Sequence, residues 1–331
     1  MSETIAPNRR LSPRTKACLG FFAHYGTIIA LLGMMVAFSI ASPRAFPTRI
    51  NFVNVLNQAS LAMIIAAGLT VAVAVGELDL SIGFAASLHG ILVTGLIVSN
   101  QLPILVAILI VIAIGAFIGL INGLIVTKAR VNSVIATLGI GTILTGLAFA
   151  YSAGVPIVAG VPDAFLSISL GRWLWGIPNN IIFMVIVVGG LWVLVERTSL
   201  GQEIQAVGGN PSAARLAGIN VDRIKLLGFV ISGVCAALTG ILLASRLGSG
   251  TASAGDSYLL TAFAAVFLGS ATLRDGEFHI LGTVIGALII AFGFNGLSIF
   301  GAPTFSQYVL QGAILIVAVA LSSLGRAIAV S

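Results

Sequence analysis

The sequence predicts an all-α integral membrane protein with about ten transmembrane helices, and three observations support this fold class. First, 58% of the 331 residues are hydrophobic, only 8% are charged, and the mean hydropathy is +1.14. A soluble domain has about 25% charged residues, so a soluble fold of this composition would expose large apolar patches. Second, apolar runs long enough to cross a bilayer recur along the chain. Third, basic residues collect in alternate loops.

The expected spans are apolar runs separated by short polar segments. They cover residues 21–41, 57–75, 82–99, 103–126, 133–151, 180–195, 226–244, 258–270, 280–299 and 307–324. The run 258–270 is short, because about 20 apolar residues are needed to cross a bilayer. We expect the first run to be a retained helix rather than a cleaved signal peptide, since it is long enough to span and more spans follow. Residues 21–325 then form one transmembrane domain between tails at 1–20 and 326–331.

Basic residues in the loops predict the orientation. Twelve Lys and Arg fall on one side, which the positive-inside rule makes cytoplasmic, and four fall on the other. The cytoplasmic residues are Arg9, Arg10, Arg14, Lys16, Lys128, Arg130, Arg197, Arg215, Arg223, Lys225, Arg274 and Arg326, and the external ones are Arg44, Arg49, Arg172 and Arg246. Both termini are therefore expected in the cytoplasm. The net charge of +6 is explained by topology, so we expect no nucleic-acid partner.

Several chemistries find no support in the sequence. Cys18 and Cys235 are too few for a disulfide framework, and no Cys/His cluster has metal-ligand spacing, so no metal is expected. The motif H-E-x-x-H is absent and no residue stands out as a nucleophile, so we expect no enzyme. The phosphate-binding motif G-x-x-x-x-G-K-[ST] is absent too, so any ATP hydrolysis must occur on another polypeptide.

Glycine spacing indicates close helix packing and hints at an internal repeat. Gly115, Gly119 and Gly123 form a small-residue stripe, as do Gly282 and Gly286, and such stripes let helix backbones approach closely in lipid. Residues 115–124 (GAFIGLINGL) and 286–297 (GALIIAFGFNGL) both end in Asn-Gly-Leu, in spans that would run in opposite directions. An inverted-topology repeat and a chance similarity in low-complexity sequence both explain this echo.

The longest expected cytoplasmic loop, residues 196–225, contains a complete short helix. Asn210 is a suitable N-cap, Pro211 suits the first helical position, and Gly218 suits the C-terminal stop. One interpretation is a docking helix for a cytoplasmic partner that moves the spans. The other is an interfacial linker helix without a partner. The residues alone leave both open.

Two further polar segments interrupt the apolar pattern. Residues 76–83 (GELDLSIG) place Glu77 and Asp79 close to apolar runs, where carboxylates are costly unless they are paired or hydrated. This segment is either a broken-helix element at the pathway or its inner mouth, or a turn in which Asp79 or Ser81 caps the next span. We favour a gate or structural role over substrate contact. Residues 269–277 suit either a loop near the pathway or a solvated turn.

An ion-coupled secondary carrier is the main alternative class. Such carriers place ionisable residues inside spans, whereas nearly all charges here lie in loops. His24 and His89 are the ionisable groups near or in a span, and we expect His89 to hydrogen-bond within the bundle. This pattern disfavours proton coupling.

Four segments carry a more specific resemblance: residues 76–83 (GELDLSIG), 123–138 (GLIVTKARVNSVIATL), 198–225 (TSLGQEIQAVGGNPSAARLAGINVDRIK) and 281–288 (LGTVIGAL). With them the chain resembles the ribose-type permease family of bacterial ABC importers, from about residue 25 to 325. The resemblance implies a type II importer-like permease that moves a sugar, polyol or autoinducer-2 type solute across the bacterial inner membrane by alternating access. It also implies a second permease copy in a homodimer or related heterodimer, a cytoplasmic ATPase that binds ATP and Mg²⁺, and a periplasmic binding protein. The chain departs from the family at Glu77, where a second glycine is usual, and at residues 273–279 (LRDGEFH), which are normally glycine-rich.

The resemblance places the ATPase contact on the 196–225 loop, with the candidate residues Gly201, Gly208, Gly209, Asn210, Pro211, Ala213, Ala214, Arg215, Gly218 and Ile219. The candidate gate or pathway loop comprises Gly76, Glu77, Asp79, Leu80, Ser81 and Gly83. Polar residues in or at the ends of spans are candidates for the substrate pathway, although for any one of them we favour interhelical hydrogen bonding: Asn57, Gln58, Asn122, Asn295 and Ser298.

Overall fold

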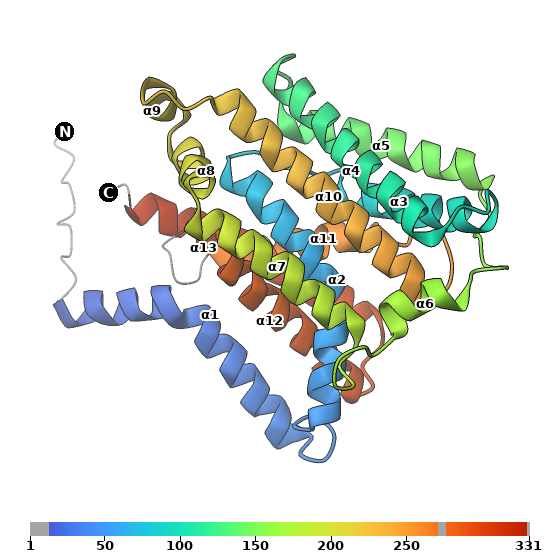
Figure 1. Ribbon diagram of the computed structural model, residues 1–331. Helices are drawn as coiled ribbons and strands as arrows, with labels where there is room; N and C mark the ends of the chain where they lie inside the picture. Colours follow the sequence, from blue (N-terminus) through green and yellow to red (C-terminus); the bar gives the residue numbers. More distant parts are fainter. Residues whose placement is uncertain (1–12, 271–275, 330–331) are drawn as a thin grey trace, which may run out of the picture.

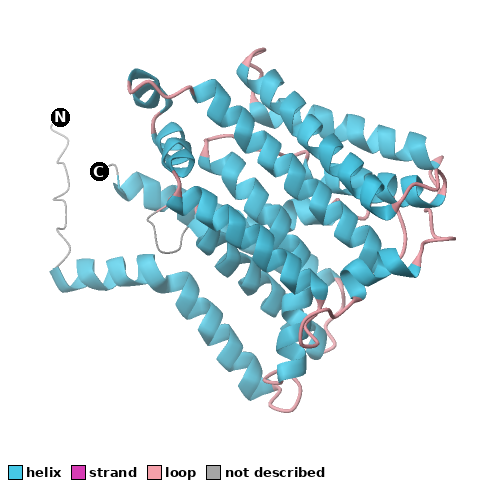
Figure 2. Ribbon diagram, in the orientation of Figure 1, coloured by secondary structure: helices cyan, strands magenta, loops and turns pink. Residues whose placement is uncertain are grey.

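The computed structural model describes residues 13–270 and 276–329, and in these ranges the chain is a bundle of helices (Figures 1 and 2). Helices long and apolar enough to cross a membrane are α2 (Arg49–Ala74), α4 (Ile104–Thr127), α5 (Ser133–Ser152), α7 (Asn179–Arg197), α10 (Val221–Leu247) and α12 (Ile280–Ile299). Shorter apolar stretches lie in α1 (Pro13–Ala41), α3 (Ile82–Val98), α11 (Ser257–Ser270) and α13 (Phe305–Ala329). These helices coincide with the ten predicted spans, so the predicted fold class is confirmed.

The starts differ most at α1 and α2, and the short helices are only partly predicted. Helix α1 begins at Pro13, eight residues before the predicted start at 21 and within the predicted tail 1–20. Helix α2 begins at Arg49, eight residues before the predicted start at 57, because the Thr48 hydroxyl caps it by accepting a hydrogen bond from the Asn51 backbone N–H at 3.1 Å. The amphipathic helix α8 (Ser199–Gly209) and the short helix α6 (Asp163–Leu170) were not predicted. Both are too short or too polar to give a span signal.

The bundle has two ends, which we name after the short helices that lie there (Figure 1). The α8–α9 end carries α8, α9 (Pro211–Leu216) and the ends of α2, α4, α7, α10 and α12 adjoining them. The α6 end carries α6 and the opposite ends of the same helices. Helix α10 runs between these ends through the middle of the bundle and contacts α2, α3 and α4.

The glycine stripes are packing positions, as predicted. A Cβ atom on Gly119 would overlap the Phe229 carbonyl oxygen of α10, and one on Gly115 would meet the same helix one turn further on. A Cβ atom on Gly282 of α12 would likewise overlap the carbonyl oxygen of Gly269 in α11. Helix backbones therefore touch directly at both stripes, which is how small residues hold helices together in lipid.

The packing has the form of an inverted repeat. Helices α3 and α11 are short, and each is preceded by a non-helical connector, residues 75–81 and 248–256 respectively. Helix α10 packs against α3 and α4, and α2 packs reciprocally against α11 and α12. Since α2 and α10 run in opposite directions, the units α2–α3–α4 and α10–α11–α12 correspond with inverted topology. Helices α4 and α12, which share the Asn-Gly-Leu ending, occupy equivalent places in the two units.

Candidate functional site

Helices α8 and α9 form the segment between α7 and α10. The Asn210 side-chain oxygen accepts hydrogen bonds from the backbone N–H groups of Ser212 at 3.1 Å and Ala213 at 3.0 Å. Pro211 is the first residue of α9, and Gly218 just beyond it has φ = +86°, a left-handed conformation that favours glycine. The predicted capped helix is therefore confirmed, and each of the three signal residues has its predicted backbone role.

One side of this segment is packed firmly onto the membrane-spanning helices. A Cβ atom on Gly208 would overlap the carbonyl oxygen of Ala74, so α8 touches the last residue of α2 directly. Gly201 lies equally close to the Val195 carbonyl at the end of α7, whereas nothing lies near a Cβ on Gly209. Buried apolar side chains complete the contact between α8–α9 and α2, α7, α10 and α12: Val71, Ala74, Val75, Val195, Ile204, Val207, Ala214, Val221, Ile224 and Ile280, with Ile219 packed against them.

The other side of α9 is exposed. Leu216 is 92% exposed, and Pro211, Ala213, Arg215 and Gly218 are also exposed. This side of α9 is therefore accessible to another protein.

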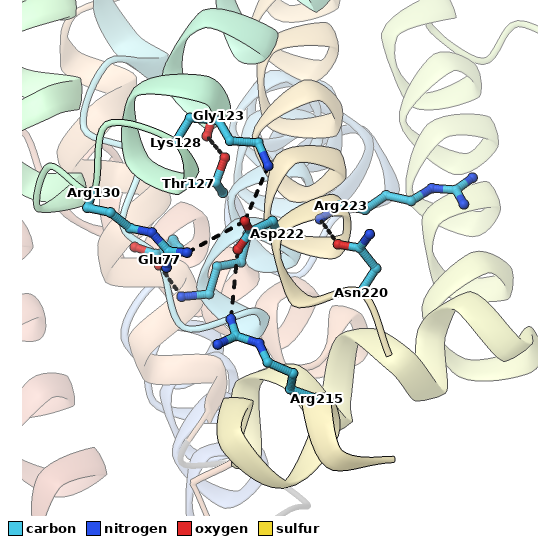
Figure 3. Close-up of polar contacts among 10 residues, drawn as sticks. Glu77, Gly123, Thr127, Lys128, Arg130, Arg215, Asn220, Asp222 and Arg223 are labelled. Carbon is cyan, nitrogen blue, oxygen red and sulfur yellow. Dashed lines mark hydrogen bonds and ion pairs between the residues drawn. The ribbon is translucent and has the colours of Figure 1, made fainter. Parts of the chain in front are cut away.

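Asp222, in the first turn of α10, lies close to three cations from two other segments (Figure 3). Its carboxylate lies 3.4 Å from Lys128 Nζ and 3.7 Å from an Arg130 nitrogen in the α4–α5 loop, and 3.9 Å from an Arg215 nitrogen in α9. Each pair is exposed and contributes about 0–1 kcal/mol. Because three cations share one carboxylate, this surface keeps an excess of positive charge.

The connector between α2 and α3 is held by a buried polar network. The Asp79 carboxylate is 1% exposed and accepts hydrogen bonds from Ser81 Oγ at 2.6 Å, from the Ser81 backbone N–H at 3.0 Å, and from Ser232 Oγ of α10 at 2.7 Å. Asn122 of α4 donates to Ser81 Oγ at 2.8 Å. Three donors converge on one carboxylate, which is what a buried acidic group requires.

The same connector is fixed to α5 through its backbone. The Leu80 N–H donates to Thr137 Oγ1 at 3.0 Å, and the Leu78 N–H donates to Ser133 Oγ at 3.3 Å. Gly83, in the first turn of α3, faces Leu259 of α11 and the carbonyl of Asp256, the residue before α11. The connector is thus held against α5, and the helix that follows it packs closely on the start of α11.

Glu77 supplies a second link to α10. Its carboxylate accepts a hydrogen bond from Lys225 Nζ at 2.5 Å, and the two side chains are 11% and 22% exposed (Figure 3). Gly76 before it has φ = +84°, which allows the chain to turn out of α2. Both carboxylates of the segment are thus paired or fully hydrogen-bonded, as the cost of their burial predicted.

The five polar residues proposed for the pathway do not form one site. Asn295 and Asn51 exchange two hydrogen bonds of 2.9 Å between α12 and α2, and Asn57 accepts one from Asn180 of α7 at 3.3 Å. Asn122 belongs to the Asp79 network near the other end. Gln58 and Ser298 are exposed, and Ser298 accepts a hydrogen bond from Gln307. Asn295 and Asn57 thus bond between helices, and Asn122 bonds to the α2–α3 connector, while a place on the substrate pathway remains a prediction for all five residues.

One prediction fails and another cannot be compared. His89 is fully buried, but neither ring nitrogen has a hydrogen-bond partner within the described residues, so the expected hydrogen bond is wrong. Its Cβ packs against Gly240 of α10, which offers no side chain to bond. The residues 271–275 of the 269–277 segment lie outside the described part of the chain.

The sequence did not predict that Lys225, Ser232 and Thr137 hydrogen-bond to the α2–α3 connector. Each is far in sequence from its partner, and no local signal marks it.

Comparison with known proteins identifies the family. Residues 51–319 match the family described as "Branched-chain amino acid transport system / permease component". The ribose import permease protein RbsC of Haemophilus influenzae is 38% identical over 302 residues, which is 90% of this chain and 93% of that protein. RbsC of Bacillus subtilis is 40% identical, with 91% and 93% of the two chains covered. The chain belongs to the ribose-type family of ABC-importer permeases.

Other relatives of this permease carry different sugar names. The galactose/methyl galactoside import permease protein MglC of Escherichia coli is 34% identical over 93% of this chain and 96% of its own. No solved structure is significantly similar to this permease. Within the described residues, no group of three or more His, Cys, Asp or Glu side chains could hold a metal ion.

Proposed function

We propose that this chain is the membrane-spanning subunit of an ATP-driven importer that moves a sugar or similar polar solute. The observation that carries the proposal is the α8–α9 segment, which is exposed on one side and packed on the other against the ends of four spanning helices. A partner that presses on α9 would move α2, α7, α10 and α12 together. The relatives named for ribose and galactose favour a sugar over a branched-chain amino acid as the solute.

The distribution of basic residues between the two ends of the bundle supports a membrane orientation and a place for each partner. The α8–α9 end carries Lys128, Arg130, Arg197, Arg215, Arg223 and Lys225 among its described residues, whereas Arg44, Arg49, Arg172 and Arg246 lie at the α6 end. The positive-inside rule makes the α8–α9 end cytoplasmic, where the ATPase subunit is found. We propose one ATPase bound at α9, a second permease copy beside the chain, a binding protein at the α6 end, and a pathway open alternately to the two sides.

The experiment that tests this proposal is co-purification of the tagged permease from native membranes in mild detergent, followed by mass spectrometry. We expect a stoichiometric ATPase with phosphate-loop motifs. Asn210→Ala removes both capping hydrogen bonds, worth about 1 kcal/mol, which a six-residue helix cannot spare. Gly218→Ala puts an L-residue at φ = +86°, which costs roughly 1–2 kcal/mol.

We expect the two substitutions together to release the ATPase and abolish ATP-driven uptake while the permease still elutes as a folded species. Gly301→Ala is the matched control, because Gly301 also has a positive φ (+68°) with no atom near its Cβ, but lies at the α6 end. If the double variant transports at the wild-type rate, α9 is not the coupling element. If the chain purifies alone and moves solute in ATP-free vesicles, it is an ion-coupled carrier.

A further inference from the structure

A group of polar side chains lies where α11 begins, inside the bundle's membrane-spanning depth. Asp256 precedes α11, Ser257 is its first residue, and Thr261 follows one turn later. Gln311 of α13 donates a hydrogen bond from Nε2 to Thr261 Oγ1 at 2.9 Å. Ser257 is exposed, Asp256 and Thr261 are partly exposed, and Gln311 is 7% exposed.

The depth of Asp256 follows from its contacts with α3. A Cβ on Gly83, near the start of α3, would lie 3.0 Å from the Asp256 carbonyl oxygen, and Ser87 one turn later bonds the Asp256 side chain. The start of α3 is level with Ser232, roughly 16 Å from the first residue of α10 at 1.5 Å per residue. The next turn of α3 is level with Gly240, roughly 10 Å before the last residue of α10. Asp256 therefore lies in the central part of the bundle's depth.

The carboxylate is positioned from one side. Asp256 Oδ1 accepts a hydrogen bond of 2.6 Å from Ser87 Oγ, and Ser87 is 2% exposed. Ser87 Oγ in turn accepts one from the Gly255 backbone N–H at 2.9 Å. Asp256 Oδ2 accepts no hydrogen bond within the described residues. A partly exposed carboxylate is thus held in place with one oxygen available.

Such a group is incompatible with contact to lipid. A charged side chain near the centre of a bilayer costs about 3 kcal/mol on insertion scales, and intramembrane carboxylates almost always face a bundle interior or a water-filled cavity. Large apolar side chains are exposed in the middle of other spanning helices, for example Ile143 of α5 at 56% and Ile186 of α7 at 63%. The face of the molecule at Asp256 therefore differs from the lipid-facing surface.

We propose that Asp256, Ser257 and Thr261 line the solute pathway at mid-membrane and that the available oxygen of Asp256 accepts hydrogen bonds from hydroxyl groups of the passing solute. This inference rests on the proposed transport function. A carboxylate beside two hydroxyls suits a neutral polyhydroxylated solute and repels an anionic one such as a sugar phosphate. Two hydroxyls and one carboxylate oxygen offer few hydrogen bonds, which favours release.

The test is the aqueous accessibility of this position in the complex with its ATPase, in membrane vesicles. In a background of Cys18→Ser and Cys235→Ala, Ser257→Cys is treated with small hydrophilic methanethiosulfonate reagents, one cationic and one anionic. Ile186→Cys is the matched control, because it is exposed in the middle of a spanning helix on the apolar surface. Retention of the ATPase is measured on the same sample, so that failure of the importer assignment is seen separately.

We expect Ser257→Cys to react with both reagents, at rates that change when ATP is added, and Ile186→Cys to remain unlabelled. With Asp256 present, the cationic reagent is favoured. Asp256→Asn should lower the ratio of cationic to anionic labelling rates about tenfold, which is the effect of one charge on two opposite charges roughly 6 Å away in a water-like dielectric. Asp256→Glu, which keeps the charge, should keep the ratio.

Either of two results would overturn the proposal. The first is that Ser257→Cys is as unreactive as Ile186→Cys while the ATPase is still bound, which would place Asp256 in a dry protein contact. The second is that Asp256→Asn leaves the ratio of labelling rates unchanged in a complex that is still folded.

Discussion

Substitution of Asp79 tests whether its hydrogen bonds stabilise the α2–α3 connector. Its carboxylate receives hydrogen bonds from Ser81 Oγ, the Ser81 N–H and Ser232 Oγ at 2.6, 3.0 and 2.7 Å, in a site that is 1% exposed. Asp79→Ala removes the acceptor of all three. Each buried donor left without a partner costs about 1–3 kcal/mol, although some of this is recovered because hydroxyls can turn to other acceptors. We expect a loss of roughly 3 kcal/mol in the free energy of unfolding.

Two conservative variants separate hydrogen bonding from charge. In Asp79→Asn the amide oxygen still accepts both bonds from Ser81, and the Ser232 hydroxyl can turn to accept from the amide N–H. We therefore expect a loss of only about 1 kcal/mol. Ser232→Ala removes one of three donors to the carboxylate and should cost about 1–2 kcal/mol.

The assay is unfolding of the purified protein by SDS titration in mixed micelles, followed by near-UV circular dichroism, with ATP-driven uptake measured in parallel. The reasoning is refuted if Asp79→Ala is as stable as the wild type. It is also refuted if Asp79→Asn loses as much as Asp79→Ala, because the charge rather than the hydrogen bonds would then hold the connector.

Two further predictions concern packing and charge. Lys225→Glu places two carboxylates together and should lower the melting temperature in detergent, and adding Glu77→Lys should restore most of the loss because the pair is reversed and not removed. Arg223→Glu, the same charge change on an exposed position of the same turn, should have little effect; equal losses at the two sites would contradict the pairing. Gly119→Leu should cost about 3 kcal/mol or more and reduce monodisperse yield in size-exclusion chromatography, because its Cβ meets the backbone of α10. Gly139→Leu, where a Cβ meets nothing within 4 Å, is the control, and similar yields from the two variants would show that α4 and α10 do not pack at Gly119.

Local sequence was enough to predict the class of the molecule, the ten apolar helices and the capped helix α9. These features depend on local composition: a span is a run of apolar residues, and the cap at Asn210 and the stop at Gly218 act on their own backbone. The spacing of Gly115, Gly119 and Gly123 likewise predicted a packing face, because helical periodicity places them on one side.

The tertiary structure alone decided which polar groups meet. Glu77 and Lys225 are 148 residues apart, Asp79 and Ser232 are 153 apart, and Ser87 and Asp256 are 169 apart. The sequence marked the connector that carries Asp79 as a polar segment but gave no signal for the one that carries Asp256. Only the packing of α3 against α10 and α11 brings both connectors inside the membrane-spanning depth. In lipid, apolar residues cover almost every surface of a helix, so hydrophobic pattern says little about which face meets which neighbour. Which helix faces meet depends on backbone contacts at glycines and on long-range hydrogen bonds between a few buried polar groups.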